Sequence, residues 1–148
     1  MKKLFTTAAL LLSASFAFAQ QQYTNVKVLS IQVNKFPRER MNGARFDRHS
    51  APDLFAVFSA NNEEVYVTNY YENVRKLPVT FDLVRPFKVE NLDIPYTLNL
   101  MDYEQMGDDE LIQKVSGNLV FADYKDYPSE ITLNYKGMAE VVLKLQWY

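Results

Sequence analysis

Short apolar segments of alternating polarity, separated by turn signals, constrain the fold of this chain more than any other feature. No stretch of ten residues repeats its apolar positions at the 3.6-residue spacing of an amphipathic helix. Aromatic side chains, which pack well on a pleated surface, make up 14% of the sequence. The pattern therefore predicts an all-β domain built as an antiparallel sandwich or barrel.

The expected strands are located by alternation and by the residues that interrupt it. The first strand contains an irregularity around Leu29–Ser30, and the pair Asn61–Asn62 marks a turn. Pro86 belongs at a sheet edge or a turn, because proline cannot donate a backbone hydrogen bond. Strands are expected at residues 23–33, 54–58, 65–68, 79–84, 87–89, 94–101, 115–121, 131–135 and 138–148.

The first residues have the features of a signal peptide. Two lysines precede an apolar stretch from Leu4 to Leu12, and Ala17–Ala19 forms a small-x-small cleavage site. The apolar stretch is too short and too interrupted to span a membrane. We therefore expect residues 1–19 to be removed and residues 20–148 to form one domain without a transmembrane span. That domain is expected to be periplasmic or secreted.

Composition excludes several classes of function. The chain has no cysteine, so it has no disulfide scaffold, thiolate zinc site or cysteine nucleophile. A net charge of −2 argues against a general nucleic-acid-binding protein, which usually carries a basic excess. His49 stands beside Ser50 rather than in a triad arrangement, and phosphate-loop and dinucleotide motifs are absent. We expect neither an enzyme nor a nucleic-acid-binding protein.

Carboxylates gather in two segments that are expected to lie in loops. Asp47 lies in the long polar stretch 34–52, and Asp53 opens the strand that follows it. Clustered carboxylates repel one another unless water, arginines or a cation intervene. Oxygen ligands on irregular backbone suit calcium, which accepts flexible coordination. A later stretch adds five carboxylates within nine residues, namely Asp102, Glu104, Asp108, Asp109 and Glu110.

With these two loops, the chain resembles the C2 domain, a calcium-dependent phospholipid-binding β-sandwich. In that family a first loop supplies two aspartates, and a later loop supplies Asp-x-Asp and then a further Asp before an apolar pair. The segments PDLFAVF, KLPVTFDL, LNLMDYE and VVLKLQWY are similar to strands of the family. The resemblance covers nearly all of residues 20–148. It implies an antiparallel eight-stranded β-sandwich with the C2-like Greek key.

The resemblance also implies a ligand set, with two glutamates where the family has aspartates. Asp109 is an alternative to Glu110 under a one-residue shift, and calcium is the implied ion. The implied ligands are Asp47, Asp53, Asp102, Glu104 and Glu110.

The implied function is non-catalytic. Loops at one end of the sandwich would bind an anionic membrane surface or a protein partner with the assistance of calcium. The implied contacts with lipid or partner are Arg45, Arg48 and Met106.

Other interpretations compete with this one. An EF-hand is excluded, because Gln113 stands where that loop requires glutamate. The acidic stretch is also typical of a solvated cluster that pairs with the arginines at positions 38, 40, 45 and 48. A metal-independent carbohydrate- or protein-binding module is the alternative function, and an enzyme accessory or inhibitor subunit is a third class. The aromatic surface of a carbohydrate module would consist of Tyr66, Tyr70, Tyr71, Tyr124 and Tyr127.

Overall fold

A computed structural model describes residues 23–40, 43–46 and 50–148. Within these ranges it has eight strands and one short 3₁₀ helix, η1, so the predicted all-β fold is confirmed. No helix among them is long and apolar enough to cross a membrane. The expected signal peptide, Asp47, Arg48 and His49 lie outside the described residues. The elements are β1 (Val26–Lys35), β2 (Leu54–Ala60), β3 (Glu63–Val67), β4 (Val79–Val89), β5 (Tyr96–Asp102), β6 (Glu110–Leu119), η1 (Phe121–Asp123), β7 (Glu130–Tyr135) and β8 (Ala139–Trp147).

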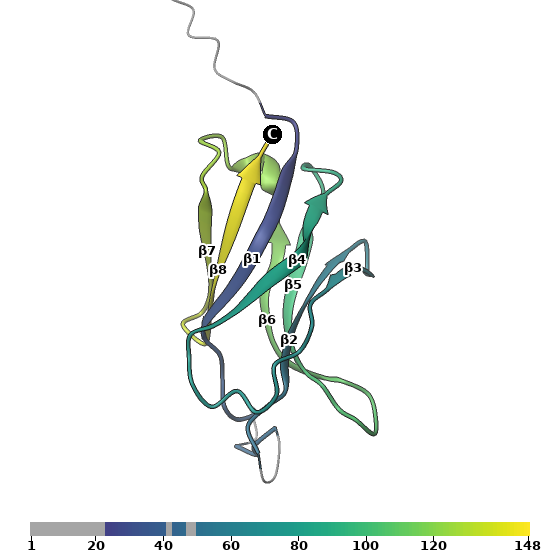
Figure 1. The fold of residues 1–148 in the computed structure, drawn as a ribbon, viewed down its shortest axis with the longest axis vertical. Coiled ribbons are helices and arrows are strands. Elements are labelled where there is room, and N and C mark those ends of the chain that lie inside the picture. Colours follow the sequence, from purple (N-terminus) through teal and green to yellow (C-terminus); the bar gives the residue numbers. More distant parts are fainter. Residues whose placement is uncertain (1–22, 41–42, 47–49) are drawn as a thin grey trace, which may run out of the picture.

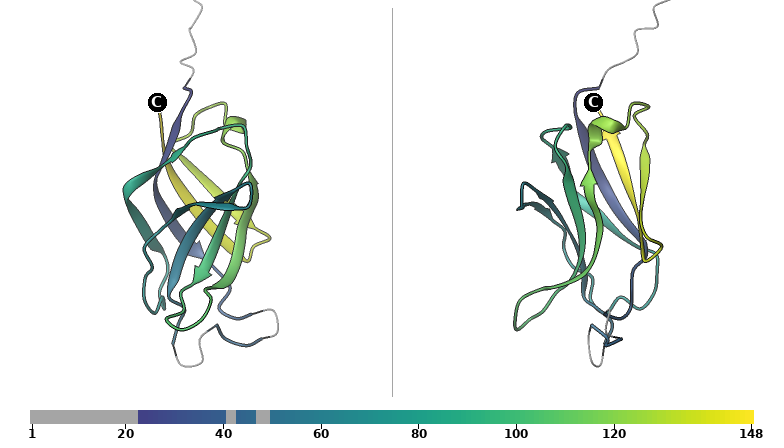
Figure 2. Two further views of the ribbon diagram at one scale, coloured as in Figure 1. Left: turned by 90° about the vertical axis from the view of Figure 1, so that its right-hand side faces the viewer. Right: turned by 180° about the vertical axis from the view of Figure 1, so that it is seen from behind.

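The strands form two four-stranded sheets that pack face to face (Figure 1). One sheet has the order β4-β1-β8-β7 and the other the order β3-β2-β5-β6, and the pairings in both are antiparallel. The side views in Figure 2 show the two layers. Three of the six strand pairings join strands that are not consecutive in the sequence, and several connections cross between the sheets at the two ends of the sandwich.

Alternation along the strands puts one face of each sheet into a shared core. In β8, for example, Val141, Leu143 and Leu145 are buried, and the residues between them are more exposed. Phe58 of β2 stacks on Phe87 of β4 across the sandwich, with ring centroids 4.9 Å apart. Burial of these apolar side chains is the main source of stability in a chain without disulfides.

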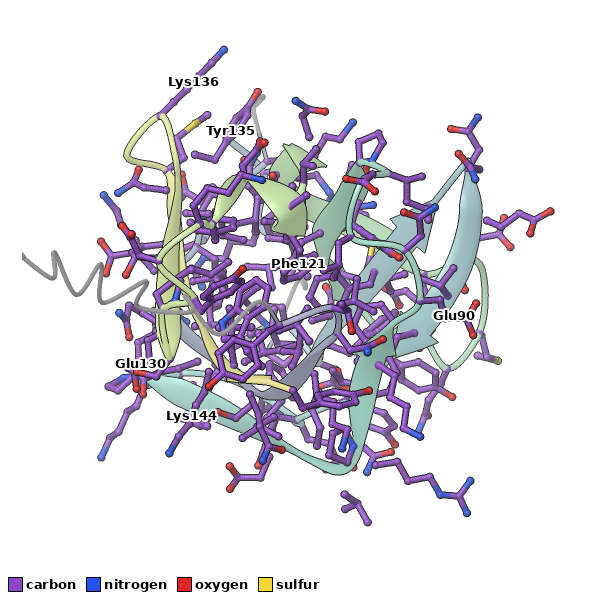
Figure 3. The ribbon with its side chains drawn as sticks, turned by 90° about the horizontal axis from the view of Figure 1, so that it is seen from above. Glu90, Phe121, Glu130, Tyr135, Lys136 and Lys144 are labelled. Carbon is purple, nitrogen blue, oxygen red and sulfur yellow. The ribbon has the colours of Figure 1, made fainter. Side chains whose placement is uncertain are left out.

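The 3₁₀ helix closes one end of this core. Phe121 of η1 is fully buried, and the view from above shows it near the centre, between the sheets (Figure 3). Glu130 and Lys144 are register partners on β7 and β8 and lie toward the periphery of the same view.

Two local predictions about backbone irregularity are confirmed. Asn61 and Asn62 both have positive φ, at 53° and 66°, and connect β2 to β3. That conformation matches the right-handed twist of a two-residue hairpin, and asparagine tolerates it better than most residues. The register of β1 shifts between Val28 and Ser30, where the sequence predicted an irregularity.

The two strands expected at 79–84 and 87–89 are one strand, β4, so this prediction was wrong. The pairing of β4 with β1 passes from Asp82 opposite Ser30 to Phe87 opposite Val28. Residues 83–86, including Pro86, therefore lie in a bulge. Because β4 is an edge strand, the missing N–H of proline costs no hydrogen bond to a neighbour.

The strand expected at 115–121 begins earlier than predicted. β6 starts at Glu110, which pairs with Asp102 at the end of β5, and the chain turns into η1 at Phe121. The acidic connection is thereby shortened to residues 103–109. Glu110 consequently has the fixed position of a strand residue rather than the freedom of a loop residue.

The short turn 136–138 between β7 and β8 lies at one end of the sandwich, which we call the loop end. Three longer connections gather at the same end. They are residues 36–53 between β1 and β2, 68–78 between β3 and β4, and 103–109 between β5 and β6. This end is at the bottom of Figure 1, where the connection 103–109 projects away from the sandwich body. The C-terminus is at the opposite end, where the backbones of Asn25 and Tyr148 exchange hydrogen bonds of 3.1 and 3.0 Å.

Candidate functional site

The strand ladder brings three of the implied calcium ligands together at the loop end. Asp53 directly precedes β2, Asp102 ends β5 and Glu110 begins β6. Asp102 pairs with Leu54 on one side and with Glu110 on the other. The sequence therefore predicted correctly that these three residues lie at one end of the sandwich. Asp47 lies outside the described residues.

Asp102 and Asp53 act as hydrogen-bond acceptors that hold the connections together. Asp102 is fully buried, and its Oδ1 accepts the backbone N–H of Asp53 at 2.7 Å. Oδ1 of Asp53 accepts the backbone N–H of Asn73, also at 2.7 Å. The backbone carbonyl of Asp53 accepts the N–H of Tyr103 at 2.9 Å. These bonds join the connections 36–53, 68–78 and 103–109 into one unit.

The carboxylate of Glu110 is paired with the guanidinium of Arg40. Arg40 donates from Nε to Oε1 at 2.5 Å and from Nη2 to Oε2, so the contact is bidentate. The same guanidinium donates to the carbonyls of Arg45 at 3.0 Å and Phe46 at 3.1 Å. Its carbon lies 5.6 Å from the centre of the Phe46 ring. Arg40 therefore fastens the connection 36–53 to the start of β6.

The pairing shifts the pKa of both residues in the direction that favours the charged form. The hydrogen bond to Glu110 raises the pKa of Arg40, burial lowers it, and attraction to Glu110, Asp102 and Glu104 raises it further. The hydrogen bond from Arg40 lowers the pKa of Glu110, against an opposing effect of burial. Both groups are therefore charged at neutral pH. Asp102 and Glu104 lie within the electrostatic reach of the same guanidinium.

The connection 103–109 is closed by its own hydrogen bond and exposes an apolar tip. The backbone N–H of Glu104 donates to Oδ1 of Asp109 at 3.0 Å. Asp109 is thus an acceptor within the loop. Tyr103 stacks on Tyr70 of the neighbouring connection, with ring centroids 4.4 Å apart. Met106 is 94% exposed, as the implied contact role requires.

A pocket of about 450 Å³ lies at the loop end, between connections 36–53 and 68–78. Arg38 is fixed there, since its Nη1 donates to the carbonyl of Val74 at 2.6 Å and its Nη2 to that of Arg75 at 3.1 Å. Its guanidinium lies 4.7 Å from the centre of the Phe36 ring. We call this the arginine pocket; it is lined by Arg38, Glu39, Arg45, Phe46, Ser50, Ala51 and Arg75.

The charge of the arginine pocket is opposite in sign to that of the chain. Among the described residues that line it, three carry guanidinium groups and one, Glu39, carries a carboxylate, whereas the chain has a net charge of −2. Arg45 was among the contacts implied by sequence. Arg75 was missed because nothing in its local sequence links the connection 68–78 to the connection 36–53.

Comparison with solved structures gives the fold family. The structure named BON1-C2B has a TM-score of 0.56 at 16% identity, over 84% of this chain and 91% of that one. The chain has a C2-like fold. A calcium-bound structure of two C2 domains of Extended-Synaptotagmin 2 matches at a TM-score of 0.51 and 12% identity, over 83% of this chain and 44% of that one.

A third solved structure that is similar to this chain is that of a phospholipase. Human GIVD cytosolic phospholipase A2, in complex with Methyl gamma-Linolenyl Fluorophosphonate, has a TM-score of 0.52 at 11% identity. The match covers 84% of this chain but 17% of the phospholipase chain. No protein-family model and no curated protein sequence matches the chain. At these identities the likeness establishes the fold and leaves the function to the residues of the site.

The carboxylates of this C2-like domain do not form a metal centre in the part of the chain that the structure describes. No group of three or more His, Cys, Asp or Glu side chains there is arranged to hold a metal ion. Asp102 accepts a backbone N–H, and both oxygens of Glu110 accept from Arg40. The residues described therefore do not fit the ion that the family implies, and calcium binding stays a prediction.

The tyrosines considered for carbohydrate binding do not share one surface. Tyr66 and Tyr71 donate their hydroxyls to β4 carbonyls, those of Arg85 at 2.7 Å and Thr80 at 3.0 Å. These tyrosines, with Tyr70, line one pocket, whereas Tyr124 and Tyr127 line another. Tyr66 and Tyr71 have a structural role, because their hydroxyls satisfy carbonyl acceptors of the edge strand β4.

Proposed function

We propose that the chain is a non-catalytic binding module whose loop end holds anionic lipid headgroups at a membrane surface. The arginine pocket is the observation that carries this proposal. A guanidinium group offers a planar fork of donors that matches the oxygens of a phosphate. Hydrogen bonds hold Arg38 to two backbone carbonyls, so one donor group is positioned before a ligand arrives. The features of residues 1–19 support export to a periplasmic or secreted location.

Met106 supports a membrane as the source of the anionic group. This residue is 94% exposed and lies in connection 103–109, at the same end as the arginine pocket. An apolar side chain at a loop tip gains free energy when it enters the interfacial region of a bilayer. A phosphate on a protein partner would gain nothing from this methionine.

The acidic side chains of the same connection limit the strength of binding. Glu104, Asp108 and Asp109 oppose approach to a negatively charged surface, so little long-range attraction is expected. Binding then depends on short contacts between guanidinium groups and phosphates, which salt weakens. In the competing, calcium-assisted form of this proposal, the implied ligands Asp47, Asp53, Asp102, Glu104 and Glu110 would hold a cation that neutralises the acidic side. Binding that persists in EGTA supports the arginine-pocket form.

The first prediction is that charge at the pocket, and not charge in general, determines vesicle binding. The double variant Arg45→Gln/Arg75→Gln is expected to weaken binding to phosphatidylglycerol vesicles roughly 10- to 30-fold, at about 1 kcal/mol for each arginine near the surface. The measurement is co-sedimentation in EGTA at low and physiological salt. Phosphatidylcholine vesicles serve as the neutral surface.

A matched control removes the same charge elsewhere. Arg85→Gln/Lys88→Gln changes two exposed residues of β4 and is expected to alter binding less than threefold. Equal losses in the two double variants would show that only net charge matters and would reject the pocket. Binding to a phosphopeptide without binding to vesicles would assign the pocket to a protein partner instead.

The second prediction concerns the exposed loop tip. Met106→Ser is expected to weaken vesicle binding roughly 10- to 150-fold, because full burial of a methionine side chain contributes about 1.5–3 kcal/mol. The melting temperature should stay unchanged, since the side chain contacts solvent in the free protein. Val84→Ser, at 91% exposure in the bulge of β4 rather than at the loop end, is the control and should leave vesicle binding unchanged. Wild-type binding by Met106→Ser would exclude insertion of this loop.

A further inference from the structure

Arg40 lies beside carboxylates of the loop end. Its guanidinium pairs with both oxygens of Glu110 and donates to the carbonyls of Arg45 and Phe46. Glu110 is the register partner of Asp102, so the pair lies beside a fully buried carboxylate. Two hydrogen bonds from this side chain join the connection 36–53 to the β5–β6 hairpin, and two more brace the connection itself.

The positive charge of Arg40 compensates the negative charge of the carboxylates around it. A buried carboxylate such as Asp102 is costly unless a cation or several donors compensate it. Attraction to Asp102 and Glu104, in addition to the stronger contact with Glu110, raises the pKa of Arg40. One guanidinium therefore acts on three of the five carboxylates that the sequence resemblance assigned to calcium.

We infer that Arg40, through its bidentate contact with Glu110 beside the buried Asp102, supplies the positive charge that a divalent metal ion would supply at this position. The guanidinium supplies positive charge. Its planar donors also form hydrogen bonds in fixed directions, which a spherical ion does not do. Because both oxygens of Glu110 are already bonded, an entering calcium ion must first displace the Arg40 pair. The Arg40–Glu110 contact accordingly compensates charge among the described residues of the loop end without calcium. This inference concerns order and metal dependence, and it holds whatever the arginine pocket binds.

The test compares melting temperatures in EGTA and in 2 mM CaCl₂. The wild-type protein is expected to melt within about 1 °C in the two buffers, since an ion that does not bind the native state adds no stability. Arg40→Gln is expected to melt at a lower temperature in EGTA. Calcium should restore roughly 5 °C or more of this loss, because the freed carboxylates then accept the ion.

Arg38→Gln is the matched control, because Arg38 lies in the same connection but donates to carbonyls of Val74 and Arg75 rather than to a carboxylate. Its melting temperature should fall without any response to calcium. A wild-type melting temperature that rises by several degrees in CaCl₂ would overturn the inference. The same holds if Arg40→Gln and Arg38→Gln respond to calcium alike.

A second variant keeps the inference testable if Arg40→Gln does not fold. Arg40→Lys retains the positive charge but loses the bidentate fork, so it is expected to fold with a lowered melting temperature and to ignore calcium. Stabilisation of Arg40→Lys by CaCl₂ to the same extent as Arg40→Gln would contradict a charge-based role. Isothermal titration of the wild-type protein with CaCl₂ should show no binding heat, and measurable heat would also reject the inference.

Discussion

Phe58→Ala is expected to lower the free energy of unfolding by about 3–5 kcal/mol, the largest single-residue effect that we predict. The Phe58 side chain is fully buried on β2 and stacks on Phe87 of β4 at a centroid distance of 4.9 Å. Phe87 also contacts the rings of Tyr66 and Tyr96, at 5.3 and 5.9 Å. The substitution therefore leaves a cavity between the sheets and removes contacts from the aromatic group that joins them.

The measurement is urea unfolding followed by the fluorescence of Trp147, the single tryptophan of the chain. Its indole N–H donates to the carbonyl of Pro128 at 2.8 Å, so its environment is fixed in the native state. Phe58→Leu should cost about 1–2 kcal/mol, because a smaller cavity remains. Val84→Ala, at 91% exposure, should stay within about 0.5 kcal/mol of wild type. A cost below about 1 kcal/mol for Phe58→Ala would contradict the packing described.

The fold could be predicted from the sequence because its signals are local. The asparagine pair at 61–62 favours one turn geometry, and the irregularity at Leu29–Ser30 interrupts an alternation that is visible in the sequence. The edge position expected for Pro86 is confirmed, but the division of the strand at Pro86 was wrong, because the effect of proline depends on its position in the sheet. In a central strand it would end the pairing, but at the edge it fits a bulge within β4.

The site could be predicted only in part, because its decisive contacts join distant segments. The spacing of Asp53, Asp102 and Glu110 predicted their common location. Pairing of the acidic stretch with nearby arginines was the competing interpretation, and the Arg40–Glu110 contact supports it across 70 positions of sequence. Among the described residues, Arg38 donates to backbone carbonyls and not to a carboxylate. The choice among several arginines depends on loop geometry, which no residue pattern encodes.

Asp102→Ala is expected to lower the free energy of unfolding by about 2–3 kcal/mol. Its carboxylate is fully buried and accepts the N–H of Asp53 at 2.7 Å. Alanine leaves this backbone donor without that acceptor and removes a negative charge that acts on Arg40. Asp102→Asn should cost about half as much, because an amide oxygen can still accept from Asp53. Urea unfolding followed by Trp147 fluorescence measures both variants.

The control variant Asp108→Ala separates the effect of losing a buried acceptor from the effect of losing one negative charge. Asp108 lies exposed in the same connection, and its removal should change stability by less than about 0.5 kcal/mol. Equal costs for Asp102→Ala and Asp102→Asn would argue against the hydrogen bond as the cause.

Calcium should not change the loss of unfolding free energy in the Asp102 variants, because Asp102 stabilises the fold as an acceptor for the N–H of Asp53. A lowered melting temperature in an Asp102 variant is therefore no evidence for a metal site. The Arg40 variants, which alter the cation rather than the acceptor, are the ones that distinguish a guanidinium-held loop end from a calcium-held one. If the Asp102 costs in EGTA and in 2 mM CaCl₂ differ by more than about 1 kcal/mol, calcium takes part in the native state and Arg40 is not its replacement.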